Sequence, residues 1–153
     1  DPSGPPNNLS PYILQVAIGK RPHVNVFGDG YETADGTGER DYLHVMDLAD
    51  GHVAALNWLK KQSVQEEGLC EVFNLGTGRP VSVLQAIAAV SKACGKDIPY
   101  KIEGPRQGDL ACVYADPAKA KAVLGWEAQR TFEDACVDGW AWQSSNPNGF
   151  KTE

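Results

Sequence analysis

Basic residues are in the minority, with 14 Lys and Arg against 20 Asp and Glu in a chain of 153 residues. Proteins that bind nucleic acid through its phosphates rely on surplus positive charge. We therefore expect no nucleic-acid partner, and any anion site must be built locally. No apolar run approaches the roughly 20 residues of a membrane-spanning helix, so we also expect no membrane partner.

Cysteine is scarce and does not occur in a metal-binding pattern. The four cysteines are widely spaced, with no C-x-x-C pair and no nearby pair of histidines that would indicate zinc. They are Cys70, Cys94, Cys112 and Cys136. We expect them to be buried thiols of a cytoplasmic protein.

Several common catalytic motifs are missing: G-x-S-x-G, H-E-x-x-H and G-x-x-x-x-G-K-[ST]. A Gly76-x-Gly78 pattern precedes a predicted helix, as in a dinucleotide-binding turn, but Val81 stands where the third glycine should be. Because the helix begins only near Ser82, a tight strand-to-helix turn is the favoured interpretation and a pyrophosphate cradle the weaker one. His44 and His52 are more simply structural histidines than catalytic bases.

The residues that are present predict alternating helices and short strands, an α/β fold in one globular domain. Helices are expected over residues 8–18, 48–62, 83–94 and 135–145, with a short one from Asp116-Pro117 to near Gly125. Strands are expected over 23–27, 41–45, 71–76, 98–103 and 112–115, and a turn over 62–68. The opening "DPSGPPNN" resembles a loop within a chain, so we expect a piece of a longer protein.

Local signals set the predicted helix boundaries. Asp47 is expected to cap the second helix, whose Leu48, Val53, Leu56 and Leu59 form one apolar stripe. Ser82 is expected to begin the third helix, and "TFED" at 131–134 resembles a capping box before the last. The apolar segment 71–76 is expected to be a buried strand.

Three polar features together indicate a nucleotide-sugar site. Arg40 borders a Gly-rich loop, and Arg106 lies in a turn three residues before Asp109. Arginine grips phosphate oxygens with two parallel bonds, and a carboxylate accepts bonds from sugar hydroxyls. Asn7-Asn8 and Asn25 offer amides, which donate and accept as a nucleobase edge requires. Each feature alone is more simply explained by a cap, a turn or a salt bridge.

These residues fall into segments that resemble the C-terminal half of UDP-glucose 4-epimerases, which are extended short-chain dehydrogenases. The matching segments are "NNLSPY", "NVFG", "YETADGTGERDYLHV.D", "NLGTG", "RQGD" and "GW.WQ..NP.GF". The "DGTGERDY" loop is the most specific segment, because in other members of the family the loop before the shared "RDY.HV.D" is shorter. The resemblance implies that residues 1–153 form the UDP-sugar-binding part of a Rossmann-type fold, with a small mixed sheet, and that the N-terminal NAD-binding domain is missing.

The resemblance also assigns roles by position. Arg40 and Arg106 resemble a pyrophosphate clamp, Asp109 the acceptor for ribose hydroxyls, and Val113 a position facing the sugar, where a small side chain admits an N-acetyl group. The remaining predicted substrate-binding residues contact the diphosphate and uracil or line the pocket: Asn7, Asn8, Leu9, Asn25, Val26, Phe27, Tyr42 and Val83.

The family's reaction passes a hydride between sugar C4 and NAD, and its catalytic Tyr-x-x-x-Lys lies upstream of the matched region. No tyrosine here has a lysine four residues later; Tyr114 comes nearest, with Lys119 one place too far. We therefore expect an inactive chain, a homodimeric full-length enzyme, and a strand at 71–76 that joins the NAD domain's sheet. The alternatives are a related nucleotide-sugar epimerase, dehydratase or decarboxylase, or a non-catalytic UDP-sugar-binding module.

Overall fold

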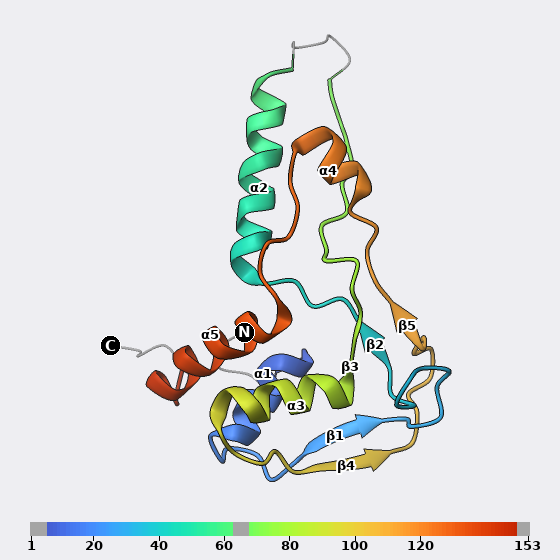
Figure 1. Ribbon diagram of the computed structural model, residues 1–153, viewed down its shortest axis with the longest axis vertical. Helices are drawn as coiled ribbons and strands as arrows, with labels where there is room; N and C mark the ends of the chain where they lie inside the picture. The colour runs from blue at the N-terminus through green and yellow to red at the C-terminus, as the bar shows by residue number, and fades with distance from the viewer. Residues whose placement is uncertain (1–5, 63–67, 150–153) are drawn as a thin grey trace.

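The structure is a computed structural model that describes residues 6–62 and 68–149. Its elements form a compact lower body and an arm that rises from it (Figure 1). In chain order they are α1 (Leu9–Ala17), β1 (Val24–Phe27), β2 (Glu39–Arg40), α2 (Val45–Lys60), β3 (Val81–Ser82), α3 (Val83–Cys94), β4 (Tyr100–Glu103), β5 (Cys112–Val113), α4 (Ala118–Leu124) and α5 (Phe132–Ser145). The predicted α/β arrangement with a small mixed sheet is confirmed.

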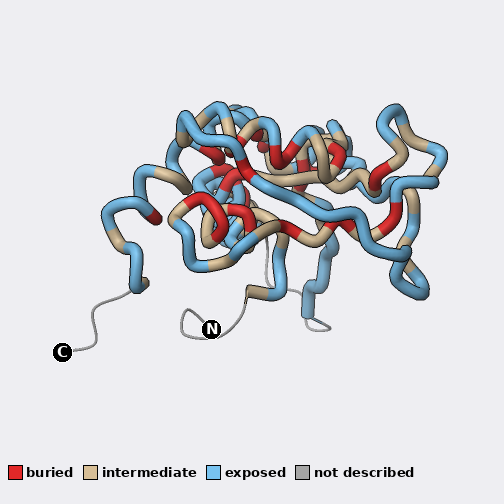
Figure 2. Tube along the Cα trace, turned by 90° about the horizontal axis from the view of Figure 1, so that it is seen from below, coloured by how far each residue is buried: buried red, intermediate tan, exposed pale blue. Residues whose placement is uncertain are grey.

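The lower body holds the hydrophobic core. Helices α1, α3 and α5 pack on one another, and β1 lies parallel to β4. Ile13, Val24, Val26 and Val90 are essentially inaccessible to solvent. Buried residues of α1, β1, α3 and α5 form one cluster, and Figure 2 marks the buried stretches in red along the chain. The core therefore supports one rigid side of the cavity described below.

A second, three-stranded sheet positions the predicted anion-binding arginine. Strand β2 lies between β3, to which it is antiparallel, and β5, to which it is parallel. Arg40 is opposite Val81 on one side and Val113 on the other. Its backbone is thus held by neighbours from two distant parts of the chain.

Most predicted helices are confirmed, since their boundaries depend on local chemistry. Ser82 starts α3 through a capping box: its Oγ accepts from the Gln85 amide at 3.1 Å, and its own amide donates to Gln85 Oε1 at 3.0 Å. Gly95, at φ 67°, ends that helix. Thr131 and Asp134 form the predicted box before α5. Helix α1 and strand β1 also lie where expected.

The predicted strand at 41–45 and the Asp47 cap are wrong. Strand β2 ends at Arg40, and α2 begins at Val45 with His44 as its cap, whose Nδ1 accepts from the Met46 amide at 3.1 Å. Asp47 is instead buried in the first turn, where it accepts bonds from the amides of Gln129 and Arg130 at 3.1 and 2.8 Å. A contact about 80 residues away in sequence therefore outweighs the local capping preference.

Helix α2 and the segment at 71–76 form the arm, and both differ from expectation. The apolar stripe of α2 is exposed, with Val53 at 56% and Leu56 at 57%. The segment at 71–76 is not a strand, and Val72 is 72% exposed. A buried strand needs a hydrogen-bonded neighbour and a covering layer, and the described part of the chain provides neither. Most of the turn predicted at 62–68 lies outside the described residues.

One glycine joins the two parts of the arm. Gly51 is buried in the middle of α2. A Cβ there would stand 2.6 Å from Leu75 Cδ1 and 3.2 Å from Trp126 Nε1. The bare backbone of α2 thus allows both side chains to pack directly on it.

The prediction of four buried thiols is confirmed only for Cys136. Cys136 is buried, and this burial raises the pKa of its thiol to about 11. Cys94 is half-buried, whereas Cys70 and Cys112 are exposed. The exposed pair lies on the arm and on β5, where no described element covers them.

Candidate functional site

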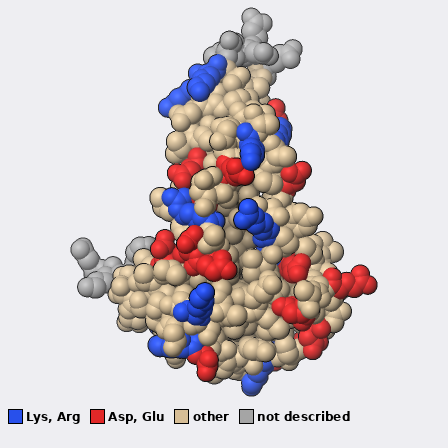
Figure 3. Space-filling view, in the orientation of Figure 1, with Lys and Arg blue, Asp and Glu red and all other residues tan. Residues whose placement is uncertain are grey.

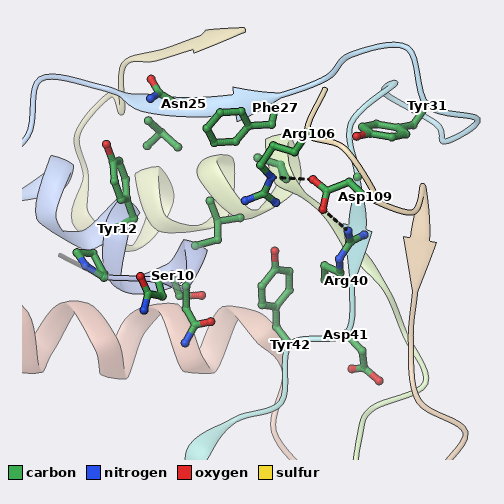
Figure 4. Close-up of a pocket in the computed structure, with 17 residues that line it drawn as sticks. Ser10, Tyr12, Asn25, Phe27, Tyr31, Arg40, Asp41, Tyr42, Arg106 and Asp109 are labelled. Carbon is green, nitrogen blue, oxygen red and sulfur yellow. Dashed lines mark hydrogen bonds and ion pairs between the residues drawn. The ribbon is translucent and has the colours of Figure 1, made fainter. Parts of the chain in front are cut away.

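A cavity of about 690 Å³ opens between the lower body and the three-stranded sheet (Figure 4). Its walls come from the start of α1, from β1, from the loop that leads into β2, from the start of α3 and from the turn before β5. The lining residues are Pro6, Asn7, Asn8, Leu9, Ser10, Tyr12, Val24, Asn25, Phe27, Tyr31, Gly38, Arg40, Asp41, Tyr42, Val83, Arg106 and Asp109. This volume suits a small ligand.

Asp109 holds two arginines on one side of the cavity (Figure 4). Arg106 Nε donates to Asp109 Oδ2 at 2.8 Å, and Arg40 Nη2 lies 3.8 Å from Oδ1. The Arg106 guanidinium also stacks 4.8 Å from the centre of the Phe27 ring. Two positive charges and one negative charge therefore converge beside an aromatic face, leaving a local surplus of positive charge.

Backbone carbonyls fix the orientation of Arg40. Its Nη1 donates to the carbonyls of Glu39 at 2.8 Å and Leu110 at 2.9 Å. Arg106 has no such support among the described residues, and its side chain is 60% exposed. The two arginines thus differ: one is built into the fold, and the other is a surface side chain.

Tyr42 stands below this cluster on the chain that follows β2. Burial raises the pKa of its phenol above the ordinary value, although the charge of Arg40 works in the opposite direction. Its ring packs 4.9 Å from that of Phe132 at the start of α5. Tyr42 is therefore a protonated, well-positioned hydroxyl at neutral pH.

The Gly-rich loop that precedes β2 is firmly held, because its polar side chains bind one another. Asp35 accepts bonds from the Thr37 amide at 2.9 Å and the Thr37 hydroxyl at 2.7 Å, and from the Ser82 hydroxyl. Burial acts to raise the pKa of Asp35, but these hydrogen bonds together lower it below its usual value. Gly36, at φ 79°, passes so close to Asp29 that a Cβ would be 2.1 Å from the Asp29 carbonyl oxygen.

Asp41 organises the turn at 76–78. Its carboxylate accepts bonds from the amides of Thr77 and Gly78 at 3.0 Å and of Ala115 at 3.3 Å. A Cβ on Gly76 would stand 2.5 Å from Asp41 Oδ2. A pyrophosphate cradle needs free backbone N–H groups at this place, and here they already bind a carboxylate. The chain turns tightly here as predicted, but the segment before the turn is not a strand.

The cavity brings together nearly all the predicted substrate-binding residues. Asn7, Asn8, Leu9, Asn25, Phe27, Arg40, Tyr42, Val83, Arg106 and Asp109 line it. Val26 does not, because its side chain is 0% exposed in the core. Val113 also lies outside the lining, on β5 opposite Arg40, and is 43% exposed. The ligand roles of all twelve residues stay predictions.

Sequence reasoning missed Ser10, Tyr12, Val24, Tyr31, Gly38 and Asp41, which also line the cavity. Tyr12 follows Asn8 by one helical turn, a spacing that could have revealed it. Tyr31 carries no local signal, because the burial of its hydroxyl without a partner depends on the folded structure. The structural interpretation of His44 is confirmed, since it caps α2 and its Nε2 lies 3.3 Å from Asp138.

Two polar atoms are buried without a hydrogen-bond partner in the described part of the chain. They are Asn25 Oδ1 and the Tyr31 hydroxyl oxygen, both on residues that line the cavity. A buried polar group without a partner costs about 1–3 kcal/mol, so native proteins rarely keep one. A ligand with hydrogen-bonding groups would provide the missing partners.

Charge elsewhere is mixed. On the face shown in Figure 3, Lys and Arg are interspersed with Asp and Glu. Within residues 6–62 and 68–149, no cluster of His, Cys, Asp or Glu has the arrangement to hold a metal ion. No helix in those same ranges is both long and apolar enough to cross a membrane.

The fold matches the C-terminal part of epimerases of the extended short-chain dehydrogenase class. The profile of a family described as GDP-mannose 4,6 dehydratase matches residues 1–138, and the chain belongs to this family.

Individual relatives carry a more specific name. The human UDP-glucose 4-epimerase is 54% identical over 153 residues, which are 100% of this chain and 42% of the relative. The UDP-glucose 4-epimerase of Bacillus subtilis is 53% identical over 152 residues, 99% of this chain and 43% of the relative.

A crystal structure of UDP-glucose 4-epimerase from Bifidobacterium longum in complex with NAD+ and UDP gives a TM-score of 0.86. The two chains are 48% identical, and the match covers 96% of this chain and 42% of that one. This chain therefore spans less than half the length of the relatives it matches.

Proposed function

We propose that residues 1–153 form the UDP-sugar-binding part of a UDP-glucose 4-epimerase, an isomerase of galactose metabolism that interconverts UDP-galactose and UDP-glucose. The observation that carries this proposal is the Arg40–Asp109–Arg106 cluster, which lies beside the Phe27 ring in a cavity of suitable volume. The names of the relatives support it independently.

The cluster suits a nucleoside diphosphate sugar. Arginine forks bind phosphate oxygens well, so Arg40 and Arg106 hold the diphosphate, and Asp109 accepts bonds from the ribose. Asn25 and Phe27 bind the base, and the helix start at Asn7, Asn8 and Leu9 closes the pocket. Val26 contributes only through its backbone, because its side chain is in the core.

In our proposal the described residues of this chain contribute no nicotinamide site. The turn most similar to one uses its amides to bind Asp41, and the sequence lacks a Tyr-x-x-x-Lys. In our proposal NAD oxidises sugar C4 transiently and is bound by the part of the enzyme that the relatives have beyond the matched region. The contribution of these residues is to hold UDP while the hexose stays free to turn.

The arm is the surface we propose for docking onto that NAD-binding domain. Large apolar side chains rarely gather on a free surface, yet α2 exposes Val53, Leu56 and Leu59. The extended segment at 71–76 would add a strand to the edge of the partner sheet, which supplies the hydrogen bonds it lacks. The full-length enzyme is then a cytoplasmic homodimer, as the family resemblance implies.

We propose that the small side chain of Val113 determines which sugars the pocket accepts. Its exposure of 43% opposes a role in the core, and a valine leaves free the space that a tyrosine ring would fill. We propose that the full-length enzyme also interconverts UDP-N-acetylglucosamine and UDP-N-acetylgalactosamine.

Calorimetric titration with UDP and GDP tests the binding proposal. We expect UDP to bind more tightly than GDP, because in our proposal Asn25 and Phe27 bind uracil. Equal affinity, or tighter binding of GDP, would instead favour a dehydratase-like member of the family. A reading frame that continues upstream through a Gly-rich turn and a Tyr-x-x-x-Lys supports the enzyme, whereas a start codon just before Asp1 supports a non-catalytic binding module.

A further inference from the structure

Tyr31 is held in place by the fold although its hydroxyl has no partner. Its amide donates to the Gly36 carbonyl at 2.9 Å, and its own carbonyl accepts from the Thr33 amide at 2.8 Å. The ring lies flat against Gly28, where a Cβ would stand 2.6 Å from Tyr31 Cε2. That glycine has φ 85°, a conformation that other residues adopt only under strain. The backbone at both positions thus fixes the ring.

The ring of Tyr31 borders the cavity, although its hydroxyl oxygen is buried. Tyr31 lines the cavity, and Figure 4 shows its hydroxyl turned toward the side that holds Asp109 and Arg106. Gly28 also approaches Pro105, the residue before Arg106, because a Cβ on Gly28 would lie 3.3 Å from Pro105 Cβ. Gly28 therefore lies close to both the Tyr31 ring and the turn that carries Arg106 and Asp109.

A buried hydroxyl without a partner is unfavourable in the free protein. The Tyr31 oxygen is buried and accepts or donates no hydrogen bond within residues 6–62 and 68–149. Tyrosine hydroxyls usually find a partner when they are buried. A phenylalanine would fill the same space without this cost, whereas a bound ligand would give the hydroxyl the partner that it lacks among the described residues.

We infer that the Tyr31 hydroxyl is a ligand-binding group that donates a hydrogen bond to a ribose hydroxyl of the bound nucleotide. This rests on the proposed function, in which Asp109 accepts from the ribose. A ribose hydroxyl that donates its proton to a carboxylate keeps lone pairs that can accept from a second donor. Tyr31 and Asp109 then bind the same group from two sides, as donor and acceptor.

The test compares the wild-type protein with Tyr31→Phe by calorimetric titration of UDP, 2′-deoxy-UDP and 3′-deoxy-UDP. We expect Tyr31→Phe to weaken UDP binding about 3- to 10-fold, the range for one neutral hydrogen bond. The loss should disappear with the deoxy nucleotide that lacks the contacted hydroxyl. Tyr114→Phe is the matched control, because Tyr114 is 59% exposed and outside the cavity lining.

Thermal unfolding without ligand is a second measurement, and it distinguishes a ligand-binding tyrosine from a structural one. Removing an unpaired buried hydroxyl should leave the melting temperature unchanged or raise it. A lowered melting temperature with equal loss of affinity for all three nucleotides would make Tyr31 structural and overturn the inference. A loss that persists with both deoxy nucleotides would overturn the ribose assignment.

The two proposals can fail separately. If wild-type protein does not bind UDP, the proposed function fails and this inference with it. If wild-type protein binds UDP and Tyr31→Phe binds it equally well, this inference alone is overturned.

Discussion

Replacing Arg106 with alanine should weaken UDP binding while the ligand-free protein keeps nearly the same stability. The Arg106 side chain is 60% exposed, and its only polar partner in the described residues is Asp109, at 2.8 Å. An exposed ion pair of this kind contributes about 0–1 kcal/mol to folding. A charge-assisted bond to phosphate contributes more, about 1.5–3 kcal/mol, which corresponds to roughly a 10- to 150-fold loss of affinity.

Arg40 should behave differently, although it faces the same ligand. Arg40→Ala removes two bonds to backbone carbonyls, at 2.8 and 2.9 Å, as well as the proposed phosphate contact. A hydrogen bond to a charged group contributes about 1.5–3 kcal/mol to stability. The contribution of the Leu110 bond is smaller than this range, because that bond is exposed to solvent. We therefore expect Arg40→Ala to lose affinity by a similar factor and also to lower the melting temperature.

The assay is calorimetric titration of UDP at two salt concentrations, with thermal unfolding of the ligand-free proteins. Arg79→Ala is the control, because Arg79 is an exposed arginine outside the cavity lining. Salt should weaken wild-type binding more than Arg106→Ala binding, since one charged contact is gone. Unaltered UDP affinity together with a lowered melting temperature in Arg106→Ala would refute the proposal that Arg106 binds the diphosphate.

The chain alone should not convert UDP-galactose to UDP-glucose when NAD is added, because it lacks a Tyr-x-x-x-Lys; turnover above a protein-free control would contradict this. In the full-length enzyme, Val113→Tyr should abolish activity on the N-acetyl pair and retain activity on the hexose pair, and equal loss of both would place Val113 in a structural role. Iodoacetamide at pH 8 should modify Cys70 in the folded protein but Cys136 only after unfolding, because burial raises the pKa of the Cys136 thiol to about 11. Mass spectrometry that finds Cys136 modified at the same rate would show that this part of the core opens readily.

Elements that depend on neighbouring residues could be predicted from the sequence, whereas those that depend on distant ones could not. Helix α3 follows from Ser82, Gln85 and Gly95, which lie at its own ends. Asp47 satisfies the same local rule for a cap, but its carboxylate is taken up by the backbone near Arg130. Segment 71–76 has the composition of a strand, yet composition provides no hydrogen-bonding neighbour.

The same distinction applies to the site. Arg40 and Arg106 stand next to Gly- and Pro-rich turns, so a polar group at a bend of the chain could be recognised in the sequence. Tyr31 could not, because the burial of its hydroxyl without a partner is a property of the folded structure. Unpaired polar groups become visible only in a folded structure.

Gly51 limits how this protein can be stabilised by engineering. A glycine within a helix is an obvious target for change to alanine, which usually gains about 0.5–1 kcal/mol. Here an alanine methyl group would be 2.6 Å from Leu75 Cδ1 and 3.2 Å from Trp126 Nε1. That indole N–H donates to the Asp47 carbonyl at 2.9 Å, so the ring cannot move aside without breaking a buried bond. A thermostability library should therefore leave position 51 unchanged and introduce its alanines elsewhere.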